Sequence, residues 1–434
     1  MHGRISTQVA RKVFHACMMK LGFIFFSSFI ASTACGQGAI ISAAGPVNRS
    51  MGSASTAAPL SALSALYNNP ATISGMERNE LEVGLDLLFS DHTIESEFGG
   101  LSGSTDSDNG AFPIPNVGWV LPTEDPRFTF GLSITSMAGL KTNVPSDTTN
   151  PALLPAPTGL GMVSSEATFL QISPVISYAL GPKLSIAAGP NITLGQLAID
   201  PFVFDSANAN GTYSSGRASQ YHWGGGFTVG AYMIGEGGWH YGVSLKSPAW
   251  METFKLQGVT DTGTPRTLEA DLDLPLILSA GTAYNGFENW IIAADFRWID
   301  YANADGFGDP ATFRADGSVP GVDFDSVFVL ALGVQRQLTD RLYFRTGYTY
   351  NENPIDDENS FFNVASPLVY EHIYSLGGTL AVNKNVAVNV AYSHYFENEV
   401  TGPIINPTIG AVPGSSITNR LSADFISFGV LMKL

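Results

Sequence analysis

The stretch ELEVGLDLLF, residues 80–89, decides the fold that this chain adopts. Apolar side chains stand at every second position, namely Leu81, Val83, Leu85, Leu87 and Phe89. Successive side chains of an extended strand point to opposite faces, so this period of two predicts a β-strand with one apolar face. The stretch RFTFGLSIT, residues 127–135, repeats the pattern.

Further segments show the same alternation, which brings the expected number of strands to fourteen. They lie near 113–121, 168–181, 183–195, 221–234, 239–250, 272–284, 289–300, 326–337, 341–350, 371–382, 385–396 and 421–434. No apolar run of about 18 residues follows residue 36, so the sequence excludes a helical membrane protein. We therefore expect an all-β chain.

The connections between these strands discriminate between two architectures. A soluble β-sandwich fits the alternation equally well. However, the short connections PTEDP, GPK, GEGG, NGFE, TD and NKN alternate with long ones near 90–112, 137–167, 196–220, 251–271, 301–325, 351–370 and 397–420. Bacterial outer-membrane barrels have short periplasmic turns and long extracellular loops. The sequence thus predicts a 14-stranded antiparallel transmembrane β-barrel over residues 80–434, in the outer membrane.

Residues 1–36 have the layout of a signal peptide. Four basic residues precede the apolar run LGFIFFSSFIA, and small residues follow it. Both cysteines, Cys17 and Cys35, lie in this segment, so no disulfide is expected within the exported chain. Loss of the four basic residues takes the formal net charge from −17 to −21. Such an acidic chain is not expected to bind nucleic acid.

An N-terminal plug, called the hatch below, is expected over residues 37–79. The segment is rich in Ala, Ser and Gly and shows no strict alternation. Fourteen strands enclose more space than wall side chains can fill, so we expect the segment to fold inside the barrel. A disordered periplasmic tail is the alternative. Asn69 and Pro70 are a turn signal, because proline fixes φ, and they predict a rigid corner at the end of the hatch.

Five stretches, taken in order, resemble the FadL family of long-chain fatty-acid transporters of the outer membrane. They are RSMGSASTA, ALSALYNNPATIS, YGVSLKSPAWME, LDLPLILSAGTAYNGFENWIIAADFRWIDY and LTDRLYFRTGYTYNENPIDD. The most specific piece is the family's Asn-Pro-Ala element, which falls on Asn69, Pro70 and Ala71. Ser61 and Ser64 stand where many relatives carry an acidic residue, which leaves the anchoring of the hatch open.

The resemblance implies passive uptake of hydrophobic molecules, with long-chain fatty acids as the expected substrate. Ligands would bind first among the extracellular loops and then in an internal pocket, and would leave sideways through the barrel wall. The family's Asn-Pro-Ala element is associated with a kink in the third strand that opens the wall. In the corresponding stretch FTFGLSITSMAGL, Gly131 or Gly139 is the expected site of the bend, because glycine in a strand often marks a bulge.

Two sets of residues are candidates for ligand contact. Exposed apolar clusters usually mark binding sites, and the predicted loops supply Leu153, Leu154, Leu160, Met162, Phe202 and Phe204. These residues can also pack on one another to close the barrel mouth. Alternation places three cations on the lumen side, where a ligand carboxylate would need one: Lys246, Arg297 and Arg345. Arg297 shares its face with Asp295 and can pair with it instead.

Other functions find less support in the sequence. There is no G-x-S-x-G elbow, H-E-x-x-H, P-loop or C-x-x-C, so we expect neither an enzyme nor a cofactor. The acidic segments TDSDNG and NENPIDDEN fit a solvated loop surface or contacts with divalent cations, and no dedicated metal site is expected. A polar-solute porin and a structural or adhesive barrel are the alternatives. The expected partners are a hydrophobic small molecule and outer-membrane lipid, with the chain acting as a monomer.

Overall fold

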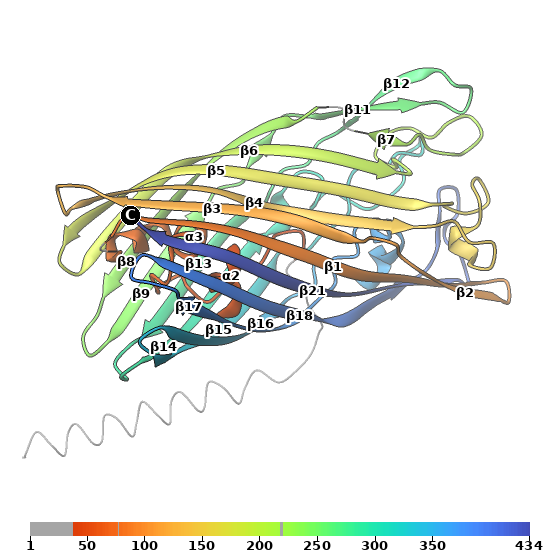
Figure 1. Cartoon of the computed structure of the whole chain (residues 1–434). Coiled ribbons are helices and arrows are strands. Elements are labelled where there is room, and N and C mark those ends of the chain that lie inside the picture. The colour runs from red at the N-terminus through yellow and green to blue at the C-terminus, as the bar shows by residue number, and fades with distance from the viewer. Residues whose placement is uncertain (1–37, 77, 218–219) are drawn as a thin grey trace, which may run out of the picture. The chain divides into compact units, whose positions relative to one another are not determined.

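The computed structural model describes residues 38–76, 78–217 and 220–434. Within these residues, fourteen strands pair antiparallel in chain order, and the first closes against the last to form a barrel (Figure 1). The barrel strands are β1 (Glu80–Phe98), β3 (Ala111–Pro122), β4 (Phe128–Val144), β5 (Val163–Gly181), β6 (Leu184–Asp200), β8 (His222–Ile234), β9 (Trp239–Lys246), β13 (Leu276–Tyr284), β14 (Trp290–Asp300), β15 (Val327–Thr339), β16 (Leu342–Asn351), β17 (His372–Ala381), β18 (Val386–Gly402) and β21 (Ser416–Lys433). The predicted barrel is confirmed. The predicted signal peptide lies outside the described residues.

The alternation in β1 turns its apolar face outward and its polar face inward. Val83 is 44% exposed and Leu85 is 40% exposed, whereas Glu82 and Asp86 are fully buried. A soluble sandwich would show the reverse, because its apolar faces point to the core. Lipid solvates the outer face of such a barrel, and pairing of β1 with β21 closes the sheet, which limits the unpaired backbone exposed to hydrocarbon. None of the helices in the described part of the chain has the length and apolar character needed to cross a bilayer.

The long loops contain structure that the sequence did not predict. Strand β1 continues past residue 89 and folds back as β2 (Leu101–Asp106), and β11 (Phe254–Val259) pairs with β12 (Pro265–Ala270) in a second hairpin. Both hairpins extend from the same end of the barrel (Figure 1). Shorter elements complete the loops: β7 (Gly216–Arg217), β10 (Trp250–Met251), β19 (Ile405–Asn406), β20 (Gly410–Ala411), η2 (Pro151–Leu153), η3 (Tyr301–Asn303) and η4 (Asp357–Asn363).

The hatch folds inside the barrel, which favours the predicted plug over a disordered tail. It comprises α2 (Gly45–Ser50), α3 (Ala62–Asn68) and the 3-10 helix η1 (Pro70–Gly75), and nearly all of its residues are buried (Figure 1). Glycines in the wall allow its backbone to approach closely. A Cβ at Gly242 would lie 2.0 Å from Thr56 O, and one at Gly347 would lie 2.1 Å from Gly52 N.

Polar contacts from β1 anchor the hatch. Arg49 Nη2 forms an ion pair with Asp86 Oδ2 at 3.0 Å, and both side chains are completely enclosed. The Glu80 and Glu82 carboxylates accept from the amides of Ala62 and Leu63 at 2.8 and 3.0 Å. Those amides are free donors at the first turn of α3, where negative charge is favourable. The sequence left open how the hatch is anchored. The structure shows that the acidic residues that anchor it belong to the first strand.

Candidate functional site

An apolar groove opens among the long loops and is called the mouth groove here. Its volume is about 770 Å³, and it lies between residues 155–162 and the β19–β20 hairpin. Met162 and Ile405 line it, and Ile409 on the hairpin is 67% exposed. A cluster of exposed apolar side chains usually marks a binding surface.

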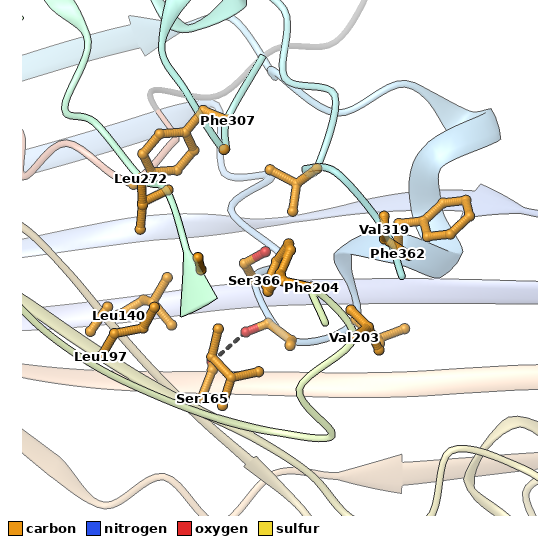
Figure 2. Close-up of a pocket in the computed structure, with 18 of the residues that line it drawn as sticks. Leu140, Ser165, Leu197, Val203, Phe204, Leu272, Phe307, Val319, Phe362 and Ser366 are labelled. Carbon is orange, nitrogen blue, oxygen red and sulfur yellow. Dashed lines mark hydrogen bonds between the residues drawn. The ribbon is translucent and has the colours of Figure 1, made fainter. Parts of the chain in front are cut away.

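A second cavity, the chamber, lies below the mouth groove and has a volume of about 120 Å³. Its wall combines strand residues such as Leu140 and Leu197 with loop residues such as Leu272, Phe307 and Phe362, which face a common space (Figure 2). Among the described residues that line it, Asp271 alone carries a charge. An enclosed and almost wholly apolar space of this kind fits a hydrophobic ligand.

The mouth groove and the chamber are continuous. They share the lining residues Leu160, Pro201, Tyr213, Phe313 and Phe361. The Tyr213 hydroxyl donates to Gly317 O at 2.5 Å, and burial together with the nearby Asp316 raises its pKa, so the hydroxyl stays protonated. Ser165 Oγ donates to Ala365 O across the chamber wall (Figure 2). These bonds hold loops of distant sequence around one apolar space.

Strands β3 and β4 pair over only six residue pairs next to the turn that joins them, and then separate. Pairing runs from Pro122 opposite Thr129 to Val117 opposite Ile134 and then ends. Residues 111–116 of β3 still pair with β1, and residues 135–144 of β4 still pair with β5. The stretch without β3–β4 pairing is called the wall gap here.

Two prolines account for the wall gap. Pro113 and Pro115 stand two residues apart in β3, so their backbone nitrogens point to the same neighbouring strand. Proline has no N–H to donate, which confines it to strand edges. Pairing with β1 continues past both prolines, whereas pairing with β4 stops short of them. The sequence AFPIPNV carries this signal, which the sequence analysis missed.

An irregularity in β4 lies beside the wall gap. The register with β5 shifts between Ser136 and Ala138, which leaves Met137 as the bulged residue. The predicted bend at Gly131 or Gly139 is therefore displaced, because both glycines pair regularly, Gly131 with Val175 and Gly139 with Thr168. A bulge needs one extra residue in the strand and can form without glycine.

The start of the hatch satisfies part of the open edge of β4. Ile40 bridges Ala138, and Ile41 N donates to Met137 O at 2.9 Å. A small cavity of about 50 Å³, the wall cavity, lies next to this contact between β1 and β4. It shares Ala39, Gly139, Leu140 and Ser366 with the chamber. The mouth groove, the chamber and the wall cavity thus lie in series and end at the wall gap.

The Asn-Pro-Ala element occupies a different part of the wall. Asn69 Nδ2 donates to Thr56 O at 2.8 Å and to Ala231 O of β8 at 2.9 Å. Its Oδ1 accepts from Ala71 N at 3.1 Å and so begins η1 behind Pro70. The predicted rigid corner is present, but the hatch residues that pair with the bulge are Ile40 and Ile41.

The three predicted cations lie in three different settings. Arg297 donates to Ser42 O at 3.3 Å and to Ser53 O, and lies 3.8 Å from Asp295, so it holds the hatch. Arg345 lines a separate cavity at the end of the barrel that carries the short turns. Lys246 lies beside the bulge, with Nζ 3.6 Å from Met137 Sδ and 4.2 Å from the ring centre of Tyr67. Its ammonium has no acidic partner within 4.0 Å among the described residues.

The predicted apolar loop residues fall into two groups, those that line a cavity and those that do not. Leu160 and Phe204 line the chamber, and Leu160 and Met162 line the mouth groove. Leu153 and Phe202 are fully buried in the loop packing, and Leu154 lines neither cavity. The sequence suggested either ligand contact or closure of the barrel mouth for these residues. In the structure, some of their side chains face the cavities and others pack together at the mouth.

Several chamber residues lie in acidic loops, one of which contains a segment that the sequence suggested was a solvated surface. The loop over 351–370 is acidic, yet its η4 segment turns Phe361 and Phe362 toward the chamber. Phe307, Val319 and Val322 come from the acidic loop over 301–325. Neighbouring apolar residues within a charged loop were the sequence signal that could have identified these chamber residues. Over the described residues, no group of three or more His, Cys, Asp or Glu is placed to hold a metal ion.

A family model matches nearly the whole chain, and several solved structures share its fold. The family model described as outer membrane protein transport protein (OMPP1/FadL/TodX) matches residues 24–430. A Pseudomonas aeruginosa FadL homologue has 16% identity and a TM-score of 0.70, with 91% of this chain and 99% of that chain covered. The toluene transporter TodX of P. putida has 17% identity and a TM-score of 0.67 at the same coverage. TbuX, the toluene transporter of Ralstonia pickettii, has 16% identity and a TM-score of 0.64, again with 91% and 99% covered. No curated protein sequence matches the chain.

Proposed function

Because this chain belongs to the OMPP1/FadL/TodX family of outer-membrane transport proteins, we propose that it admits hydrophobic molecules and releases them sideways into the bilayer. The observation that carries the proposal is the series of apolar cavities from the mouth groove to the wall gap. A ligand that follows this series stays in contact with apolar side chains, which lowers the free-energy cost of leaving the lipopolysaccharide layer. The transport is passive, and one barrel contains the whole route, so the chain works as a monomer after cleavage of residues 1–36.

The expected ligand is a long-chain fatty acid whose carboxylate lies at Lys246. This lysine lines a small cavity with Ile40, Ile41 and Met137, directly across the first hatch residues from the chamber. A half-buried ammonium inside the barrel that lacks an acidic partner is costly, and a ligand carboxylate would offset its desolvation. The Tyr67 ring at 4.2 Å compensates for part of that cost in the absence of ligand.

Replacement of Lys246 by methionine is expected to weaken fatty-acid binding roughly tenfold or more, because a charge-assisted bond is lost while side-chain length is kept. Binding of a fatty alcohol of equal chain length should change far less. Both affinities can be measured on the purified barrel, and uptake can be measured in cells that lack their own transporter. Lys255→Met, which removes an exposed loop cation beside Glu269, is the matched control. Equal losses for acid and alcohol would rule out carboxylate recognition by Lys246.

A neutral aromatic hydrocarbon is the second candidate ligand, and the chamber favours it. An engineered apolar cavity of about 150 Å³ binds benzene, and the chamber has about 120 Å³ with no lining cation among its described residues. Two of the similar structures are named as toluene transporters. Uptake of toluene without uptake of oleate by cells that carry the protein would select this candidate. Uptake of neither compound above the vector control would reject the proposed function.

The porin and structural alternatives fit the interior less well. A porin requires an open aqueous lumen, whereas here the hatch lies inside the barrel, and its backbone and side chains are hydrogen-bonded to the wall. A purely structural or adhesive barrel has no need of an enclosed apolar chamber that leads to an unpaired strand edge. Outer-membrane lipid is the proposed recipient of the released ligand.

Replacement of Asn69 by alanine is expected to reduce uptake while the barrel still folds. The change removes two hydrogen bonds within the hatch, to Thr56 and Ala71, and one that joins the hatch to Ala231 of the wall, and it leaves two carbonyls without that donor. Uptake assays together with heat-modifiable gel mobility test this result. Asn303→Ala, at an exposed loop position, is the control. Full uptake in Asn69→Ala would reduce the Asn-Pro-Ala element to a structural corner.

A further inference from the structure

A polar cavity lies at the short-turn end of the barrel and is called the periplasmic cavity here. Its volume is about 210 Å³. Wall residues of β15 to β18 and β21 line it, and Val47 and Leu60 of the hatch complete it. Among the described residues, none of those that line it also lines the mouth groove, the chamber or the wall cavity. The periplasmic cavity is therefore separate from the proposed uptake route.

Arg345 supplies an enclosed positive charge to this cavity. Its side chain is only 4% exposed, and it donates through Nε to Gln335 Oε1 and through Nη1 to Thr379 Oγ1, both at 2.7 Å. Both partners are neutral, and in the described parts of the chain no carboxylate lies within 4.0 Å of the guanidinium. A buried guanidinium normally has an anionic partner, so its counter-charge is missing.

The nearby acids are engaged elsewhere. Glu80 lines the same cavity, and Glu82 is close enough to influence Arg345 electrostatically. Each carboxylate instead accepts from a hatch amide, Glu80 from Ala62 and Glu82 from Leu63. These bonds direct the two acids toward α3, so neither forms a salt bridge with Arg345.

A second donor in the cavity also lacks an acceptor. The Asn389 side chain is 1% exposed, and its Oδ1 accepts from the Thr379 hydroxyl at 2.5 Å. Its Nδ2 is buried without a hydrogen-bond partner. Arg345 and Asn389 bond the same Thr379 hydroxyl, so the guanidinium and the free amide group lie close together. Lys384 and Lys433 add two further cations to the lining.

We propose that the periplasmic cavity binds a small anion that carries a carboxylate or phosphate group. Arg345 and the Asn389 amide would donate to its oxygens, because charge-assisted bonds from guanidinium to such groups are strong and directional. Lys384 and Lys433 would attract the anion from the periplasm. The volume of about 210 Å³ exceeds what one inorganic ion needs, so a small organic anion fits as well.

The test is a titration of the purified, folded barrel in detergent with inorganic phosphate or succinate at constant ionic strength, with chloride as the reference salt. Either anion should raise the unfolding temperature in a saturable manner, because a ligand that binds only the folded state stabilises it. A response to phosphate alone or to succinate alone would identify the preferred group. Absence of a saturable response to both would overturn the proposal.

Asn389→Asp is the decisive variant. It keeps the size of the side chain and gives Arg345 a built-in carboxylate partner, so it should fold and lose the anion response. Lys433→Gln should bind the anion more weakly, and Arg345→Met should weaken binding about tenfold or more. Arg336→Gln is the matched control, because Arg336 is one residue from Gln335 on the opposite face of β15, over the Trp290 ring. An unchanged response in Asn389→Asp would contradict the proposal, whatever the transport assays show.

Discussion

Leucine in place of Gly139 is expected to reduce uptake of a hydrophobic substrate to near the level of cells without the protein. Gly139 lies in β4 at the boundary between the chamber and the wall cavity and lines both. A Cβ at this position would lie 3.3 Å from Phe112 Cε1 and 3.4 Å from Ala167 O, so the rest of a leucine side chain must extend into the available space. That space is the wall cavity of about 50 Å³ and the adjoining part of the chamber, and a leucine side chain would obstruct the passage between them.

This experiment separates ligand entry from ligand exit. Ligand binding at the mouth groove should persist in Gly139→Leu, because Gly139 does not line the groove. Gly225→Leu is the matched control, since a Cβ at Gly225 has no neighbour within 4 Å, and its uptake should equal that of the wild type. Heat-modifiable mobility establishes that both variants fold. Wild-type uptake by a folded Gly139→Leu protein would place the exit away from the wall gap.

Replacement of Asp86 by alanine is expected to destabilise the protein by about 3–5 kcal/mol, the usual cost of removing one partner of a buried ion pair. Arg49 would then remain enclosed by the hatch and the wall, with the Phe425 ring 4.0 Å from its guanidinium carbon and no carboxylate in its place. Asn116 Nδ2 would also lose one of its two acceptors, at 3.0 Å, and would keep only Ile114 O. Reversible urea unfolding of the refolded barrel in detergent measures the loss.

The matched control is Asp125→Ala, which removes an ion pair of similar length at an exposed turn. Arg127 and Asp125 lie 2.7 Å apart but are 59% and 40% exposed, so water replaces the lost contact. Its unfolding midpoint should match that of the wild type. The double variant Arg49→Leu/Asp86→Leu should be more stable than Asp86→Ala, because it leaves no unpaired charge. Equal stability of Asp86→Ala and the wild type would show that the hatch is held by other contacts.

The sequence determined the strands and the side of the wall that each residue faces. In β1 the alternation of Val83 and Leu85 with Glu82 and Asp86 sets both the strand and its outward face, since a period of two is a local property of the backbone. The order of short and long connections predicts which end of the barrel faces the periplasm. The Asn69-Pro70 turn could likewise be predicted from the sequence, because proline restricts its own backbone.

Only the tertiary structure decided what each inward residue meets. Alternation put Lys246, Arg297 and Arg345 on the same side of the wall, yet one lies beside the bulge, one holds the hatch and one lines the periplasmic cavity. Their depth along the barrel and their partners depend on how the hatch folds across residues more than two hundred positions away. The wall gap has the same origin, because Pro113 and Pro115 remove donors locally, but only the closed sheet shows that the pairing lost is that between β3 and β4. A periodic pattern specifies a face, whereas a site requires contacts between elements that are far apart in the chain.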